Sequence, residues 1–305
     1  MKLAKLLILG GTGFFGKSIL DLFIRGGFDV YGIKEVIVAA RKIDSFWLEY
    51  PELKSEKVYL TQVDLTKTTQ LPHAEFVIHA ATSTDARDYI ADSVGQRSNI
   101  ERTTENFCSL ATRFLNGSKI VYCSSGAVYG KQPMDVPAMK EELPFQDVTG
   151  LVKHKQDYAL GKRKAEIQIQ NLGKLGLNVS IARCFAFYGK YLPKDQHFAY
   201  GNFIACAEKG EPIMVMADHK VVRTYMNADD LAHSLIRVAF DSRPECPIYN
   251  IGGAEPIEIR ELAEKIGKKY GVPVLKNPIQ NQDADLYVPD VSKLSSLGIP
   301  EKIRN

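Results

Sequence analysis

The sequence predicts an α/β fold in which a doubly wound parallel sheet is followed by a smaller, mixed α/β region. Over residues 1–184, short apolar runs alternate with amphipathic helical stretches, which is the pattern of β-α-β units on a parallel sheet. After about Phe185 the alternation breaks, and residues 189–195 and 210–212 have the composition of loops. We therefore expect two regions, 1–184 and 185–305, with some elements of the second returning to the first.

Six apolar runs are the candidate strands of the sheet. The first follows Lys2 and Lys5, so it has the outline of a secretory signal, but it is shorter than the usual core of about 7–15 residues and leads straight into glycines. We expect a buried first strand instead. The candidate strands are Leu6–Leu9, Glu35–Ala39, Val58–Val63, Phe76–His79, Lys119–Ser124 and Asn178–Arg183.

Helices are expected where apolar residues recur at helical spacing. The two longest candidates are Asn99–Leu115 and Tyr158–Leu172, and the second region adds Asp229–Phe240 and about Ile257–Tyr270. Residues 131–157 contain three prolines and mixed charge, which predicts a long surface loop. Loops of that length within a compact domain are usually functional, so we expect this one to cover a site.

The composition excludes several classes of protein. Hydrophobic residues (45%) and charged residues (25%) are balanced as in soluble globular proteins, and no apolar stretch approaches the roughly 20 residues of a membrane span. The 39 basic residues nearly balance the 36 acidic ones without a basic block, so we expect no nucleic-acid partner. Five widely separated cysteines indicate a reducing, cytoplasmic compartment and no metal site.

A glycine-rich loop follows the first candidate strand. Gly10, Gly13 and Gly16 allow a tight turn and the close approach of a pyrophosphate, and the helix that begins near Lys17 offers its N-terminal N–H groups. The position of this loop between a strand and a helix indicates a Rossmann-type dinucleotide site. Thr12, Phe14 and Phe15 belong to the same candidate site.

The end of the second candidate strand indicates which dinucleotide is bound. A carboxylate at this place would accept hydrogen bonds from a free ribose 2′-hydroxyl, but the sequence has Arg41 and Lys42. Two cations suit a 2′-phosphate, so NADP(H) is favoured and NAD(H) is the alternative. In the competing interpretation, Arg41 is a solvated charge or stacks on the adenine.

Three residues form the candidate catalytic set. Tyr158 and Lys162 are four residues apart in a helical stretch and so share a face, where the ammonium, together with an oxidised nicotinamide, can lower the pKa of the phenol. Ser125 follows a strand at the carboxyl edge of the sheet, where ligands of such sheets bind. We expect Tyr158 to act as a general acid/base and Ser125 to hold the reacting oxygen. Glu166, one turn beyond Lys162, is interpreted as part of a surface ion pair, and orientation of Lys162 is the alternative.

These residues resemble the extended short-chain dehydrogenase/reductases, the NAD-dependent epimerase/dehydratase family of nucleotide-sugar enzymes. The resemblance covers nearly the whole chain and implies a nucleoside-diphosphate sugar as substrate, in nucleotide-sugar metabolism and polysaccharide biosynthesis. It implies further cofactor contacts from Asp64, Leu65, Ala80, Ala81, Asn99 and Phe185. It implies substrate contacts from Ser83, Ser125, Asn202 and Arg223, whose guanidinium suits a diphosphate.

Two departures from the family pattern limit the reaction. The 4,6-dehydratases of the family carry an Asp-Glu pair after the catalytic hydroxyl, where this chain has Gly126 and Ala127. We therefore expect that the chain is not a 4,6-dehydratase. Many members also have an asparagine at the place of Ala186, and Asn202 is the candidate substitute.

Three functions are compatible with these observations. The leading one is an NADPH-dependent reductase of the 4-keto group of a nucleoside-diphosphate 4-keto-6-deoxysugar. The alternative enzyme is a C4 epimerase that retains NAD, and a catalytically silent nicotinamide-sensing protein is the third. The resemblance also implies a homodimer that pairs the two long helices, with Leu110, Phe114 and Ile167 as apolar contacts.

Overall fold

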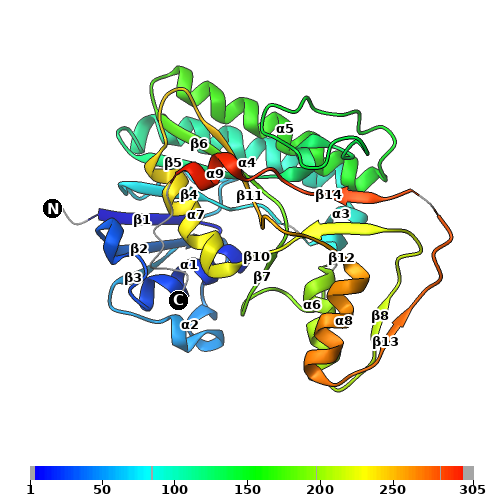
Figure 1. Cartoon of the computed structure of the whole chain (residues 1–305). Coiled ribbons are helices and arrows are strands. Elements are labelled where there is room, and N and C mark those ends of the chain that lie inside the picture. The colour runs from blue at the N-terminus through cyan, green and yellow to red at the C-terminus, as the bar shows by residue number, and fades with distance from the viewer. Residues whose placement is uncertain (1–3, 84, 197, 282, 298–305) are drawn as a thin grey trace.

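The protein is built on one seven-stranded parallel sheet, whose strands lie in the order β11-β6-β5-β4-β1-β2-β3 (Figure 1). The computed structural model describes residues 4–83, 85–196, 198–281 and 283–297. The strands of this sheet are β1 (Ala4–Leu9), β2 (Ile33–Ala40), β3 (Val58–Gln62), β4 (Phe76–His79), β5 (Lys119–Ser125), β6 (Asn178–Cys184) and β11 (Ile248–Ile251). The sequence predicted the first six, and the seventh comes from the C-terminal region.

Helices cover both faces of the sheet (Figure 1). On one face Leu6 and Ile8 of β1 pack with α1 and α7, and on the other Leu7 and Leu9 pack with α4 and α5. This alternation follows from the two-residue period of a strand, and a strand covered on both sides is apolar throughout. The helices are α1 (Phe14–Ile24), α2 (Phe46–Glu49), α3 (Ala86–Ala91), α4 (Ser93–Phe114), α5 (Lys153–Lys174), α6 (Ala199–Glu208), α7 (Ala228–Phe240), α8 (Ile259–Tyr270) and α9 (Ser292–Ser296).

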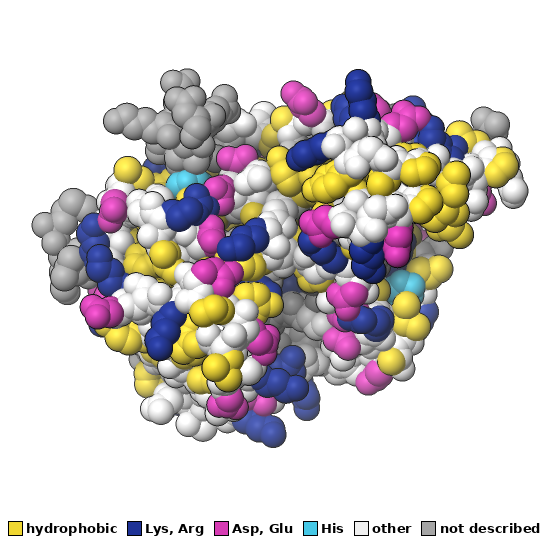
Figure 2. Space-filling view, turned by 90° about the horizontal axis from the view of Figure 1, so that it is seen from below, with side chains coloured by type: hydrophobic (Ala, Val, Ile, Leu, Met, Phe, Trp, Pro, Cys, Tyr) yellow, Lys and Arg dark blue, Asp and Glu magenta, His cyan; other side chains and the backbone are white. Residues whose placement is uncertain are grey.

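A second, smaller core lies between α6 and α8, on the right of Figure 1. Three small sheets accompany it, with strand orders β10-β7, β12-β9-β14 and β13-β8. Their strands are β7 (Phe187–Tyr188), β8 (Ile213–Val215), β9 (Val221–Thr224), β10 (Met226–Asn227), β12 (Pro256–Glu258), β13 (Val274–Lys276) and β14 (Asp285–Tyr287). Figure 2 shows the molecule from below, where lysine and arginine side chains are interspersed with acidic ones.

The order of the strands reverses between β1 and β4, since the chain runs from β1 outward to β3 on one side and from β4 outward to β6 on the other. A crevice at the carboxyl ends of the strands opens at such a point, and ligands of doubly wound sheets bind there. The glycine loop after β1 and the ends of β4 and β5 therefore meet at one edge. Among the described residues, no helix is long and apolar enough to span a bilayer.

The two long helices begin earlier than the sequence predicted. The Asp92 side chain accepts a hydrogen bond from the N–H of Gly95 and so starts α4 at Ser93, which places Asn99 in the second turn. Helix α5 begins at Lys153, so the predicted loop 131–157 ends at residue 152. Leu110 was expected on the outer surface of α4, but it is 2% exposed and packs in the core beneath the sheet, so it offers nothing to a partner.

Candidate active site

The glycine loop joins β1 to α1 through backbone contacts that exclude side chains. Gly10 has φ +82°, and a Cβ atom on it would lie 2.6 Å from the carbonyl oxygen of Ala80, at the end of β4. A Cβ atom on Gly16 would overlap the backbone of Gly11. The loop therefore lies flat against the switch point of the sheet.

The N-terminus of α1 is suited to bind an anion. Gly13 is its N-cap, no side chain caps it, and its first turn carries no acidic residue. Its free N–H groups can donate to a dinucleotide pyrophosphate, as the helix dipole favours. The rings of Phe14 and Phe15 pack against the core, with Phe15 edge-on to Phe187 at 5.3 Å, and both side chains are partly exposed. Thr12 lies in the turn itself.

Two positions beside the loop bear on the adenosine half of a dinucleotide. Arg41 follows β2, and its side chain is exposed. The Asp64 carboxylate accepts hydrogen bonds from the N–H of Thr66 (2.9 Å) and from its hydroxyl (2.7 Å), which hold the pKa of Asp64 below its usual value. Leu65 is buried in the core, so only its backbone can reach a ligand.

Ser125 and Tyr158 meet at the end of β5. The Ser125 hydroxyl accepts a hydrogen bond from the N–H of Ala127 at 3.2 Å, which begins a short 3-10 turn, Gly126–Tyr129. Tyr158 lies in the second turn of α5, close enough for its interaction with Ser125 to lower the pKa of the phenol. Both side chains are partly exposed, so a substrate can reach them.

Lys162 lies one turn beyond Tyr158 and is 2% exposed. Its ammonium donates to the carbonyl of Cys123 (2.9 Å), to the Thr82 hydroxyl (3.1 Å) and to the Tyr122 hydroxyl (3.3 Å). These three acceptors satisfy the three N–H bonds of a lysine and fix the charge beneath the site.

The pKa of Tyr158 is raised above its usual value. Burial is the largest cause, and the charge of Lys162 and the hydrogen bond from Ser125 act in the opposite direction without outweighing it. The sequence predicted that Lys162, together with an oxidised nicotinamide, could lower this pKa. In the chain alone the phenol is protonated at neutral pH, so it is poised to donate a proton.

Glu166 is not part of a surface ion pair, contrary to the sequence-based interpretation. It is 2% exposed and pairs with Arg183 of β6 at 2.8 Å, and the Ser124 hydroxyl donates to it at 2.6 Å. The periodicity of α5 placed Glu166 on the face of Tyr158 and Lys162, and that face packs against the sheet. The ion pair thus ties α5 to β6, and the Ser124 hydrogen bond ties it to β5, the strand that carries Ser125.

Ser83 lies near the catalytic pair, in the segment after β4. Its hydroxyl donates to Asp88 at 2.6 Å, and its carbonyl accepts from the Tyr89 hydroxyl at 3.1 Å. The ring of Tyr89 meets that of Tyr158 edge-on at 5.2 Å. Ala80 and Ala81, in the same segment, lie against Gly10.

The remaining candidate residues come from more distant elements. Phe185 follows β6, and its ring meets that of Tyr287 at 4.6 Å. Arg223 in β9 forms an ion pair with Asp285 of β14 at 2.7 Å, so part of its charge is already balanced. Asn202 lies in α6, and none of the hydrogen bonds among the described residues joins it to Ser125, Tyr158 or Lys162. The carbonyl of Asn99, in α4, accepts from the Thr103 hydroxyl.

A sequence model described as the NAD dependent epimerase/dehydratase family matches residues 6–252 of the chain. The chain belongs to this family. The resemblance noted from its motifs is therefore confirmed, and so is the Rossmann-type fold.

Members of the family with known names resemble the chain over nearly its whole length. UDP-glucuronic acid decarboxylase 1 of Arabidopsis thaliana is 26% identical over 96% of the chain, which spans 65% of that protein. A putative UDP-glucose 4-epimerase of Methanocaldococcus jannaschii is 25% identical over 96% of the chain and 92% of its own length.

Solved structures of the family share the fold. A UDP-N-acetylglucosamine 4-epimerase of Methanobrevibacter ruminantium M1 superposes with a TM-score of 0.81 at 20% identity, over 98% of this chain and 93% of that one. A dTDP-glucose 4,6-dehydratase of Streptomyces venezuelae, solved with NAD bound, gives 0.78 at 20% identity over 97% and 91%. At these identities, the two structures show that the chain shares their fold.

One residue at the site escaped the sequence analysis. Tyr287 reaches from β14 to Gly126, where a Cβ atom would lie 2.6 Å from its hydroxyl, and it interacts with the neighbouring Ser125. Nothing in the local sequence marks it, because β14 is three residues long and joins its small sheet through a contact with the distant strand β9. Only the pairing of Tyr287 with Arg223 in that sheet brings it to the catalytic residues.

Proposed function

We propose that the chain is a reductase of the 4-keto group of a nucleoside-diphosphate 4-keto-6-deoxysugar. The observation that carries the proposal is the meeting of Ser125 and Tyr158 above the buried ammonium of Lys162, at the carboxyl edge of the sheet. A neutral phenol is the form that gives a proton to a ketone oxygen, and the raised pKa of Tyr158 favours this form.

Each residue has one task in this reaction. The Ser125 hydroxyl holds the ketone oxygen, and Tyr158 donates its proton to that oxygen as the hydroxyl forms. The phenolate left on Tyr158 is stabilised by the charge of Lys162. The nicotinamide, when bound, supplies the hydride to the sugar carbon.

The surroundings of Gly126 support the view that the chain is not a 4,6-dehydratase. A Cβ atom at this position would lie 2.6 Å from the Tyr287 hydroxyl and 2.7 Å from the ring of Phe185. The space that an acidic side chain would need for elimination is therefore filled. Ala127 likewise has no group that transfers a proton.

NADPH is the proposed reductant. Arg41 is exposed just after β2, and its guanidinium suits a ribose 2′-phosphate on a dinucleotide bound at the uncapped N-terminus of α1. The substrate diphosphate is proposed to bind Arg223, which would exchange its contact with Asp285 for phosphate oxygens.

A C4 epimerase with retained NAD is the second candidate. It is favoured by the names of a relative, a putative UDP-glucose 4-epimerase, and of a solved structure, a UDP-N-acetylglucosamine 4-epimerase. An epimerase would keep one nicotinamide through purification and interconvert two sugar nucleotides without added cofactor. A reductase would consume NADPH in a one-to-one ratio with the 4-keto sugar.

Turnover of a nucleoside-diphosphate 4-keto-6-deoxyglucose with NADPH tests the proposal. Tyr158→Phe removes one oxygen and should lower kcat by about 10²–10⁴-fold, the usual contribution of a positioned acid/base. Tyr59→Phe, which changes an exposed phenol on β3, should retain wild-type turnover. Wild-type turnover in Tyr158→Phe would refute the catalytic assignment, and turnover of UDP-glucose to its C4 epimer with retained NAD would favour the epimerase.

A further inference from the structure

Two segments flank the crevice at the carboxyl edge of the sheet. The first follows β4 and carries the short helix α3, and its Ala80 and Ala81 lie against Gly10 of the glycine loop. The second follows β7, and residues 189–196 of it contain no helix or strand. Segments outside the core elements of a fold open at a lower cost in free energy than those elements do. The two segments are therefore the parts of the crevice that can move apart.

The second segment is anchored on the helix that follows the glycine loop. The hydroxyl of Tyr191 lies 3.1 Å from a carboxylate oxygen of Asp21 in α1 and 3.2 Å from one of Glu52. Lys190 forms an ion pair with Glu52 at 3.2 Å. Because the glycine loop leads directly into α1, this anchor holds the segment beside the uncapped N-terminus where a pyrophosphate is expected to bind.

One ion pair joins the two segments. A guanidinium nitrogen of Arg87, in α3, lies 3.3 Å from the carboxylate of Asp195, and both side chains are more than half exposed. Arg87 is held on its own side by Asp85 at 2.6 Å. Asp195 has no other ion pair within the residues that the structure describes. Removal of the Asp195 charge therefore breaks this pair and no other.

The second segment bridges a space and does not fill it. Residues 190–196 line a cavity of about 430 Å³ together with Lys17 of α1 and Tyr50 at the end of α2. The Tyr191 anchor lies on the α1 side of the glycine loop, and Arg87 lies on the β4 side. The ion pair therefore spans the crevice between these two sides, where doubly wound sheets bind a dinucleotide.

We propose that the Arg87–Asp195 ion pair is a latch across the dinucleotide crevice, which holds the two segments together over a bound cofactor. When the pair breaks, the segments part and the cofactor leaves. An exposed ion pair contributes little free energy, so this latch can open in every catalytic cycle. Its use in catalysis rests on the proposed function, because a reductase must exchange its oxidised cofactor after each turnover, and such conformational steps limit kcat in many enzymes.

The rate at which the reduced cofactor leaves tests the latch, and no sugar is needed for this measurement. The protein is loaded with NADPH or NADH, whichever binds more tightly, and stopped-flow fluorescence follows its displacement by excess oxidised cofactor. Asp195→Asn should raise the dissociation rate constant about two- to fivefold, the equivalent of one exposed ion pair. Loss of a negative charge near an anionic ligand would by itself slow its release, so faster release identifies the latch. In about 1 M salt, wild type and variant should release the cofactor equally fast.

Further variants separate the latch from a local effect. Arg87→Gln and the double variant Arg87→Gln/Asp195→Asn should match Asp195→Asn, because each breaks the same pair. Glu208→Gln is the control: it breaks the ion pair of Lys194 with α6, which does not cross the crevice, and should match wild type. An unchanged rate constant in Asp195→Asn, or effects of the two substitutions that multiply, would overturn the inference. If wild type turned over no 4-keto sugar but Asp195→Asn still released the cofactor faster, the proposed function would fall and the latch would stand.

Discussion

At the scale of single residues, burial decides what a sequence motif can do. The four-residue spacing of Tyr158 and Lys162 predicts a shared helix face, and the direction in which the lysine shifts the pKa of the phenol follows from charge alone. The depth of the phenol in the fold does not follow from spacing. Because α5 presses this face against the sheet, burial outweighs the charge, and the pKa of Tyr158 rises.

The charge at Arg41 gives a prediction about the cofactor. We expect NADP(H) to bind more tightly than NAD(H), and Arg41→Asp to reverse the preference by removing the guanidinium and adding a carboxylate that accepts from a 2′-hydroxyl. The affinity for NADPH should fall about 10–100-fold, the value of one charge-assisted hydrogen bond, as measured by calorimetry. Lys209→Asp changes the net charge equally at an exposed site in the second region and should have no effect.

His79 gives a prediction about acid stability. Burial, assisted by the charge of Lys162, lowers the pKa of His79 to about 3 from 6.5. Below pH 6.5 the histidine gains a proton in the unfolded chain but not in the folded one. The stability that the neutral His79 gives the fold is therefore complete above pH 6.5 and is lost as the pH falls toward 3. Between pH 6.5 and 4.5, this histidine should lower the free energy of unfolding by on the order of 3 kcal/mol.

His79→Phe should remove this part of the acid sensitivity, because the ring lies between the aromatic rings of Phe107 and Tyr122, which tolerate an apolar neighbour. Urea unfolding at pH 7 and pH 4.5 measures the difference. His73→Gln, at an exposed position, should keep the wild-type difference. An unchanged pH dependence in His79→Phe would contradict the assignment.

At the scale of elements, the sequence predicts what local patterns determine and misses what distant contacts determine. The apolar runs located six strands, because strands covered on both faces are apolar throughout. The starts of α4 and α5 were missed, because the first turns of both helices have little apolar periodicity. The Asp92 cap that begins α4 adds no apolar signal. Membership of β11 in the main sheet rests on its pairing with β6, and the place of Tyr287 on pairing with β9. Neither pairing leaves a local signal.

The Glu166–Arg183 pair, which joins α5 to β6, predicts a strong effect on stability. Both side chains are at most 4% exposed, so removal of one partner leaves a buried, unpaired charge. Glu166→Met should lower the free energy of unfolding by about 3–5 kcal/mol, and the double variant Glu166→Met/Arg183→Met should recover most of it. Chemical denaturation measures both.

The control for this prediction is an exposed pair on another helix. Glu261 and Lys265 of α8 form an ion pair at 2.8 Å with more than half of each side chain exposed. Glu261→Met should change stability by less than about 1 kcal/mol. If Glu166→Met had as little effect as this variant, or if the double variant were worse than the single ones, the pair would not hold α5 on the sheet.

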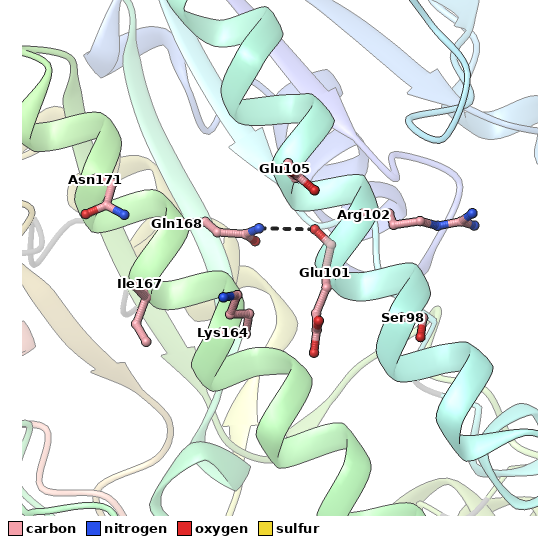
Figure 3. A pocket seen from close by; sticks show the side chains of 8 residues that line it. All are labelled: Ser98, Glu101, Arg102, Glu105, Lys164, Ile167, Gln168 and Asn171. Atoms are coloured by element: carbon pink, nitrogen blue, oxygen red, sulfur yellow. Dashed lines mark hydrogen bonds between the residues drawn. The ribbon is translucent and has the colours of Figure 1, made fainter.

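At the scale of the whole molecule, the outer face of α4 and α5 is where a second copy is expected to bind. Figure 3 shows a pocket between these helices whose lining side chains come from both, and Gln168 donates to the carbonyl of Glu101 across it. The lining combines both signs of charge with an apolar residue: Ser98, Glu101, Arg102, Glu105, Lys164, Ile167, Gln168 and Asn171. Such a face can pair with itself about a two-fold axis, since each charge can meet its opposite.

Ile167 is the test of this arrangement, because its side chain lines the pocket and is 52% exposed, whereas Leu110 is buried and Phe114 packs partly on the core. We expect a homodimer at micromolar concentration by light scattering, and Ile167→Asp should shift the mass to that of a monomer by placing a charge within the interface. Leu48→Asp, at a position 85% exposed on α2, should leave the dimer intact. A monomeric wild type would contradict the prediction. A two-fold interface contains every substitution twice, once from each copy, so the effect of Ile167→Asp is doubled. A variant that stayed dimeric would therefore place the interface on another face.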